Sequence, residues 1–230
     1  MNNNKKKITT VVLLLAFLAI AVTGGTLAYF TDSEKATNTF VMGNVKIALD
    51  ESKIKKSGDA WVTDGTDRVA TNNYATVYPG AEMKKDPIVH NIGTNDAYVR
   101  VKVTVDNGQE IMPLYGEIDP LSGGNFLKLV KNTFDGTNWT YGGAVNGADN
   151  SVVYTLTYNA RLEAGSDTTS PFEKVYFPAW IDNAEATAFQ NNLGTDGVFN
   201  INVVAEAIQA DGFTNVTEAF AAYDTQKATP

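Results

Sequence analysis

The sequence predicts an all-β protein, an antiparallel jelly-roll β-sandwich with short helical insertions. Apolar side chains alternate with polar ones over several short segments, which places one face of each strand in a core and the other in water. Turn-forming pairs such as Asp64-Gly65, Pro79-Gly80, Asn107-Gly108 and Gly142-Gly143 separate these segments, as antiparallel strands require. Short strands at this spacing are typical of sandwiches and jelly rolls.

The expected strands follow one another along the chain. The clearest contains Val99, Val101, Val103 and Val105, which alternate with polar residues. On its polar face, Arg100 is expected to be a surface or interface charge. Other segments of this kind lie at 45–49, 153–158, 172–180 and 200–209. Short helices are expected within 111–130, at 183–193 and at 217–223, and the glycine-rich stretch 135–150 is expected to be a long exposed loop.

The composition excludes most familiar enzyme chemistries. The chain has no Cys, which rules out a disulfide framework, a thiol nucleophile and Cys-ligated zinc. It has one His, His90, so a Ser-His-Asp triad or a multi-histidine metal site is hard to build. His90 is expected to be a structural or surface residue at a strand end. We therefore expect no catalytic residue and no metal site.

The charge of the chain also limits its ligands and partners. The formal net charge is −8, and nucleic acid is not an expected partner because binding phosphates needs clustered Lys and Arg. Calcium binds oxygen ligands from loops. An incidental calcium ion at Asp64-Gly65-Thr66-Asp67 or Asp135-Gly136-Thr137-Asn138 is the one cofactor left open.

The first 28 residues are typical of a secretory signal peptide. Lys5-Lys6-Lys7 precede an uncharged apolar stretch that ends in the small residues of Thr26-Leu27-Ala28, the order that marks such signals. We expect cleavage between Ala28 and Tyr29. The remaining chain has 15 basic and 26 acidic side chains, a net charge of −11. The alternative is a retained membrane anchor, because the stretch can span a bilayer at about 20 residues.

Three stretches resemble a known family. The junction Leu27-Ala28-Tyr29-Phe30-Thr31-Asp32-Ser33-Glu34, with Asn38-Thr39-Phe40 and Gly43-Asn44-Val45-Lys46-Ile47 after it, looks like the signal-peptide junction of TasA and camelysin. These are secreted proteins of Gram-positive bacteria. Asn91-Ile92-Gly93-Thr94 followed by Ala97-Tyr98-Val99-Arg100-Val101 is similar to a strand start in that family, and Ala205-Glu206-Ala207-Ile208-Gln209-Ala210 resembles its final strand. For Asn91-Ile92-Gly93-Thr94 we expect a turn that feeds a core strand.

The resemblance implies a subunit of biofilm-matrix fibres, with 1–28 as signal peptide, 29–43 as donor-strand segment and 44–230 as jelly-roll domain. In TasA-like fibres the N-terminal segment of one subunit completes a sheet of the next, an addition at an open edge that gains main-chain hydrogen bonds. The expected donor-strand residues are Tyr29, Phe30, Thr31 and Phe40. A leader folded onto its own domain is the alternative for this segment.

The same resemblance implies partners and a location. Identical subunits would form a filament, because a head-to-tail contact that does not close continues indefinitely. A SipW-like signal peptidase would process the chain, and a minor fibre-accessory protein would be a further partner. The implied location is the extracellular matrix or cell surface of a Gram-positive bacterium.

Two other functions stay open. A monomeric cell-surface adhesin or carbohydrate-binding module would use exposed aromatic side chains, for which Trp139 and Tyr141 beside the glycine-rich stretch are the candidates. A membrane-anchored metallopeptidase of the camelysin type would need metal ligands. The sequence contains no HExxH motif that would supply them.

Overall fold

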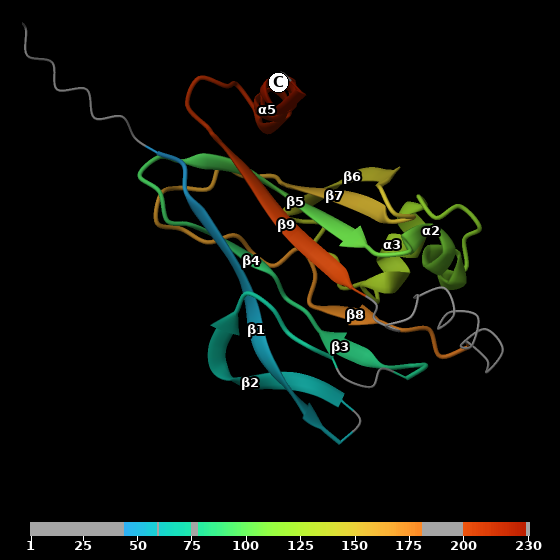
Figure 1. Cartoon of the computed structure of the whole chain (residues 1–230). Coiled ribbons are helices and arrows are strands. Elements are labelled where there is room, and N and C mark those ends of the chain that lie inside the picture. The colour runs from blue at the N-terminus through green and yellow to red at the C-terminus, as the bar shows by residue number, and fades with distance from the viewer. Residues whose placement is uncertain (1–43, 59, 75–77, 181–199, 229–230) are drawn as a thin grey trace, which may run out of the picture. The chain divides into compact units, whose positions relative to one another are not determined.

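The computed structural model describes residues 44–58, 60–74, 78–180 and 200–228. Two β-sheets made from these residues share one apolar core (Figure 1). The predicted all-β sandwich is therefore confirmed. The helix expected at 183–193 lies outside the described residues.

The first sheet has five strands in the order β4-β1-β2-β3-β8. All of its pairs are antiparallel except β2 with β3. Buried apolar residues of β3, β4 and β8 contribute to the core from this side. The strands are β1 (Ile47–Ser57), β2 (Ala60–Val69), β3 (Glu82–Lys84), β4 (Ile88–Asn91) and β8 (Lys174–Tyr176).

The second sheet has four antiparallel strands in the order β6-β7-β5-β9. Its strands are β5 (Ala97–Val105), β6 (Trp139–Asn146), β7 (Val152–Tyr158) and β9 (Ile201–Gln209). β5 is an inner strand, and the valines that alternate along it are 0–1 % exposed. The period of two in the sequence thus identified the central core strand.

Short helices join the strands and follow the last one. They are α2 (Gly108–Ile111), the 3₁₀ helix η1 (Met112–Tyr115), α3 (Gly123–Leu129) and α5 (Val216–Ala228). α5 is longer than the helix expected at 217–223. Its start is capped reciprocally: Asn215 Oδ1 accepts from the Glu218 amide, and Glu218 Oε2 accepts from the Thr214 amide. This pattern resembles a capping box, and Asn215-x-x-Glu218 was its signal in the sequence.

Two glycine-containing predictions were wrong for the same reason. The stretch 135–150 was expected to be an exposed loop, yet it contains β6, whose pairing with β7 shifts between Tyr141 and Ala144. Asp64-Gly65 was expected to be a turn between strands but lies inside β2, opposite a register shift in β1. Gly143 and Gly65 have φ angles of +103° and +71°. Glycines of this kind form bulges within strands as well as turns between them.

Candidate functional site

The predicted cleavage and donor residues, Ala28, Tyr29, Phe30, Thr31 and Phe40, lie outside the described residues. No helix in the described part of the chain is long and apolar enough to cross a membrane. In the described residues, the features that bear on function are the single histidine, the aromatic side chains, the sheet edges and the outer face of the second sheet.

His90 lies between two carboxylates on the edge strand β4, at the strand end predicted from the sequence. Its Nδ1 is 2.6 Å from Asp167 Oδ1, and its Nε2 is 3.0 Å from Asp50 Oδ1. Burial lowers the pKa of His90, but the hydrogen bonds and charges of the two aspartates outweigh this and raise the pKa overall. A protonated imidazole, the form that the two aspartates favour, has no lone pair for a metal ion.

The described residues do not fit a metallopeptidase site. Among residues 44–58, 60–74, 78–180 and 200–228, no group of three or more His, Cys, Asp or Glu is arranged to hold a metal ion. At the first calcium candidate, Asp64 is paired with Lys55 at 3.0 Å. At the second, the Asp135 carboxylate accepts hydrogen bonds from Asn138 Nδ2 and Thr169 Oγ1, both at 2.8 Å.

The aromatic residues proposed for glycan binding belong to the core. Trp139 is 1 % exposed, and its Nε1 donates to the Thr169 carbonyl oxygen at 3.1 Å. Tyr141 is half-buried and stacks on Phe126 with ring centroids 5.6 Å apart. Trp139 and Tyr141, the candidates for an exposed glycan-binding pair, instead point from β6 into the sandwich.

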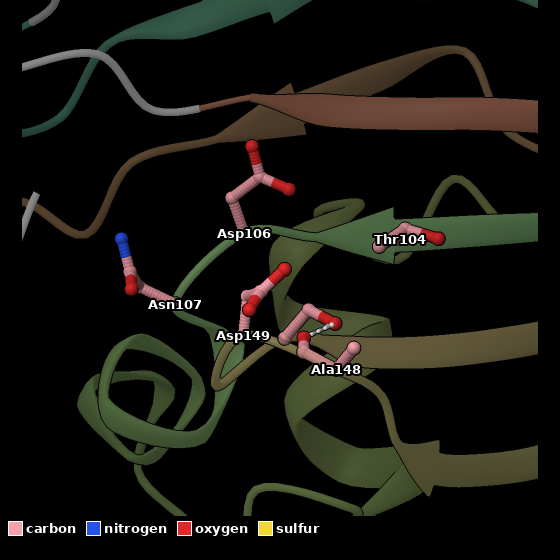
Figure 2. A pocket seen from close by; sticks show the side chains of 6 residues that line it. Thr104, Asp106, Asn107, Ala148 and Asp149 are labelled. Atoms are coloured by element: carbon pink, nitrogen blue, oxygen red, sulfur yellow. Dashed lines mark hydrogen bonds between the residues drawn. The ribbon is translucent and has the colours of Figure 1, made fainter.

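An open polar pocket lies where β5 ends, beside the turn before β7 (Figure 2). Its lining residues are Thr104, Asp106, Asn107, Ala148, Asp149 and Ser151. Asn200 Nδ2 donates a hydrogen bond to Asp106 Oδ2 at 2.9 Å, and Ser151 Oγ donates to the Ala148 carbonyl oxygen. The pocket has no apolar or aromatic platform for a sugar ring.

The free edge of β9 is the most distinctive surface of the described structure, and we call it the β9 edge. β9 runs for nine residues and pairs with β5 alone among the described strands. Its core-facing residues Ile201, Val203, Ala205 and Ala207 are only partly buried, although each lies opposite a fully buried valine of β5. Among the described residues, no strand completes the cover of the core along β9.

The other three sheet edges carry features that oppose further pairing. β6 contains the bulge at Gly142 and Gly143, and β8 is three residues long. β4 is four residues long and bonds to the segment after β7, where Thr168 donates its amide to the Val89 carbonyl oxygen at 2.9 Å. Bulges, short strands and covering segments are how proteins block unwanted strand addition.

The outer face of the second sheet is covered in part by α5. Arg100 of β5 is 7 % exposed, and Glu206 of β9 is 6 % exposed; Arg100 Nε donates to Glu206 Oε2 at 2.6 Å. The Arg100 guanidinium also lies 4.5 Å from the ring centre of Phe220 on α5. Arg100 was expected to be a surface or interface charge, but it is buried beneath α5 of its own domain.

Comparison with known proteins finds a match to one family model. The fold defines an all-β sandwich protein. Residues 3–110 match the family model of camelysin metallo-endopeptidase, and this match confirms the resemblance to the camelysin and TasA family. The match ends shortly after β5, so β6 to β9 and α5 lie beyond it. No curated protein and no solved structure matches the chain.

Proposed function

We propose that this protein is a secreted structural subunit that assembles into extracellular matrix fibres by donating residues 29–43 to a neighbouring copy. The β9 edge is the observation that carries the proposal. An incoming strand would pair with the free main-chain groups of β9 and cover its half-exposed apolar face. Residues 3–110 match the camelysin family model, the family whose resemblance implied this mode of assembly.

The donor segment is long enough for such an edge and has an apolar residue near each end. Residues 29–43 are more numerous than the nine residues of β9. Phe30 and Phe40 are separated by ten positions, and side chains an even number apart lie on one face of an extended strand. The same face carries Asp32 and Glu34 between them, so the two phenylalanines would serve as apolar anchors at the two ends of the donated strand.

Cleavage after Ala28 by a SipW-like signal peptidase would release the donor segment from the membrane and so start assembly outside the cell. The contact is head-to-tail, because the donor segment and the β9 edge are different surfaces. A contact of this kind extends into a filament unless its rotation closes a ring. A minor accessory protein would act at a filament end, where one edge has no donor.

Negative-stain electron microscopy of the chain from Tyr29 to Pro230, beside the same chain lacking Tyr29 to Phe40, tests the proposal. We expect regular thin filaments from the first and monomers from the second. Filaments from both would contradict the donor role. Monomers from both would direct attention to the adhesin alternative and to glycan-binding assays.

The family description also names a metallo-endopeptidase, and a zinc measurement on the purified chain separates that alternative from ours. We expect no stoichiometric zinc and no cleavage of casein. One zinc ion per chain together with proteolysis would replace the fibre proposal with an enzymatic one.

A further inference from the structure

The turn in front of β5 is joined firmly to the core. We call it the 91–94 turn; it comprises Asn91, Ile92, Gly93 and Thr94. The Asn91 side chain is 1 % exposed, and its Nδ2 donates to the carbonyl oxygens of Asn95 at 2.9 Å and Leu162 at 3.1 Å. Its Oδ1 accepts from the Gly93 amide at 3.1 Å. A buried amide with these partners fixes the turn.

Hydrogen bonds join this turn to the first described residues of the chain. The Asn44 carbonyl oxygen accepts from the amides of Thr94 at 3.1 Å and Asn95 at 3.3 Å, and the Ile92 amide donates to the Lys46 carbonyl oxygen at 2.9 Å. Thr94 Oγ1 accepts from the Asn44 amide at 3.1 Å. Asn44 and Lys46 are exposed, so these bonds hold the chain where burial does not.

Gly93 permits the close approach. A Cβ atom at this position would lie 2.5 Å from the Asn44 carbonyl oxygen and 2.7 Å from the Lys46 amide nitrogen. Both contacts are with backbone, which cannot rotate away as a side chain can. Any other residue at position 93 would therefore push the 44–46 segment off the turn. The motif was expected only to feed β5, and the structure adds its bonds to the segment before β1.

We propose that the 91–94 turn holds the base of residues 29–43 and sets the direction in which they leave their own domain. This inference rests on the proposed function. A donated segment with a fixed base places every subunit at the same rotation to its neighbour. A loose base would lengthen the free linker and add conformational entropy that assembly must remove. Gly93 and Thr94 are positioning residues, because they act through their contacts with Asn44 and Lys46.

The experiment uses the exported protein obtained from the full chain, as wild type, Thr94→Val and Gly93→Ala. Thr94→Val removes the oxygen that accepts from the Asn44 amide, and Gly93→Ala adds the colliding Cβ. Matched controls are Thr66→Val, at an exposed threonine of β2, and Gly136→Ala, where a Cβ would meet its nearest atom, a ring carbon of Phe134, at 3.7 Å. Thr94→Ser keeps the acceptor oxygen and serves as the conservative variant.

Two readouts are taken from each protein. Hydrogen exchange of the monomer should show the Asn44 amide exchanging about tenfold faster in Thr94→Val, the effect of one lost hydrogen bond. The β5 amides should keep wild-type rates, which shows that the sandwich is folded. Electron cryo-microscopy should show filaments of variable subunit rotation from both variants, and regular ones from the controls and Thr94→Ser.

The outcomes separate this inference from the proposed function. Unchanged exchange at Asn44 in both variants would overturn the holding role of the turn. Faster exchange with fully regular filaments would overturn its role in direction. If the wild type forms no filaments, the proposed function and the direction-setting role fail together, and the exchange rates alone decide whether the turn holds the base.

Discussion

Arg100 and Asp224 are 124 positions apart and form a bidentate ion pair between β5 and α5. Arg100 Nη1 donates to Asp224 Oδ2 at 2.9 Å, and Nη2 donates to the other carboxylate oxygen. Glu206 joins the same group of charges and accepts from Lys227 of α5 at 2.9 Å. These contacts fasten the C-terminal helix to the outer face of the second sheet.

Arg100→Met should destabilise the fold by about 3 kcal/mol, because it leaves Glu206 buried with a main partner removed. Urea denaturation measures the change in the free energy of unfolding. The matched variant is Arg161→Met: Arg161 also bridges two aspartates, Asp96 and Asp211, but is exposed to solvent. It should change stability little, since exposed ion pairs contribute little. Equal effects of the two variants would contradict the importance of the α5 contact.

The stability of the fold should fall as the pH rises above about 6.5, the ordinary pKa of histidine. The folded pKa of His90 is raised by Asp50 and Asp167 against the opposing effect of burial. The charged imidazole therefore stabilises the fold below the unfolded pKa, and this contribution is lost as the pH passes through the folded pKa. Melting temperatures at pH 6 and pH 9 measure it. In His90→Gln the melting temperature should change less between pH 6 and pH 9 than it does in the wild type. A change equal to that of the wild type would exclude His90 as the cause.

Assembly should be faster at pH 5 than at pH 8, and faster in high salt than in low salt. The chain beyond Ala28 carries a net charge of −11, and both protonation and screening weaken repulsion between subunits. Light scattering follows the rate. Assembly that is indifferent to salt and to pH over this range would refute the electrostatic argument.

The ion pairs of α5 set the lowest pH at which the subunit stays folded. They therefore limit how far acid can promote assembly. Burial raises the pKa of Glu206, but hydrogen bonds from Lys227, Arg100 and Lys102 lower it overall; the Arg100 hydrogen bond likewise lowers the pKa of Asp224. Stability from such groups is present above their unfolded pKa values and is lost as the pH falls through the folded ones. Circular dichroism should show the fold intact at pH 5 and weakened below about pH 4.

Ala205→Lys on β9 should block assembly, whereas Ala144→Lys on β6 should not. Both alanines are partly buried against the core on edge strands of the same sheet, so the two variants should lose similar monomer stability. Only the lysine on β9 would stand where a donated strand packs, and burying an unpaired charge there is costly. The measurement is the filament yield of the two variants, compared in samples with the same fraction of folded protein. Loss of filaments in both variants, or in neither, would count against the β9 edge.

Trp139→Ala should act as a core substitution and destabilise the fold by about 3–5 kcal/mol. Trp180→Ala is its control, because Trp180 is 54 % exposed and should tolerate the change. Chemical denaturation compares the two. A stable Trp139→Ala protein that had lost glycan binding would restore the adhesin alternative.

Much of the fold could be predicted from local pattern. The alternating valines of β5 identified a core strand, and the Asn91-Ile92-Gly93-Thr94 motif identified the turn before it. The helix at α5 was found but cut short at its C-terminal end, because Asp224-Thr225-Gln226-Lys227 carries no apolar side chain that would continue the pattern. Glycine pairs were assigned to turns, although Gly143 forms a bulge inside a strand. A bulge and a turn use the same backbone freedom of glycine.

The sequence by itself determined the strand periodicity, the absence of cysteine chemistry and the resemblance to the camelysin and TasA family. Only the tertiary structure decided that Trp139 is core, that Arg100 lies under α5 and that β9 has a free edge among the described strands. The physical reason is that periodicity tells which side chains share a face. Whether that face is covered depends on contacts between residues far apart in the chain, such as Arg100 with Asp224.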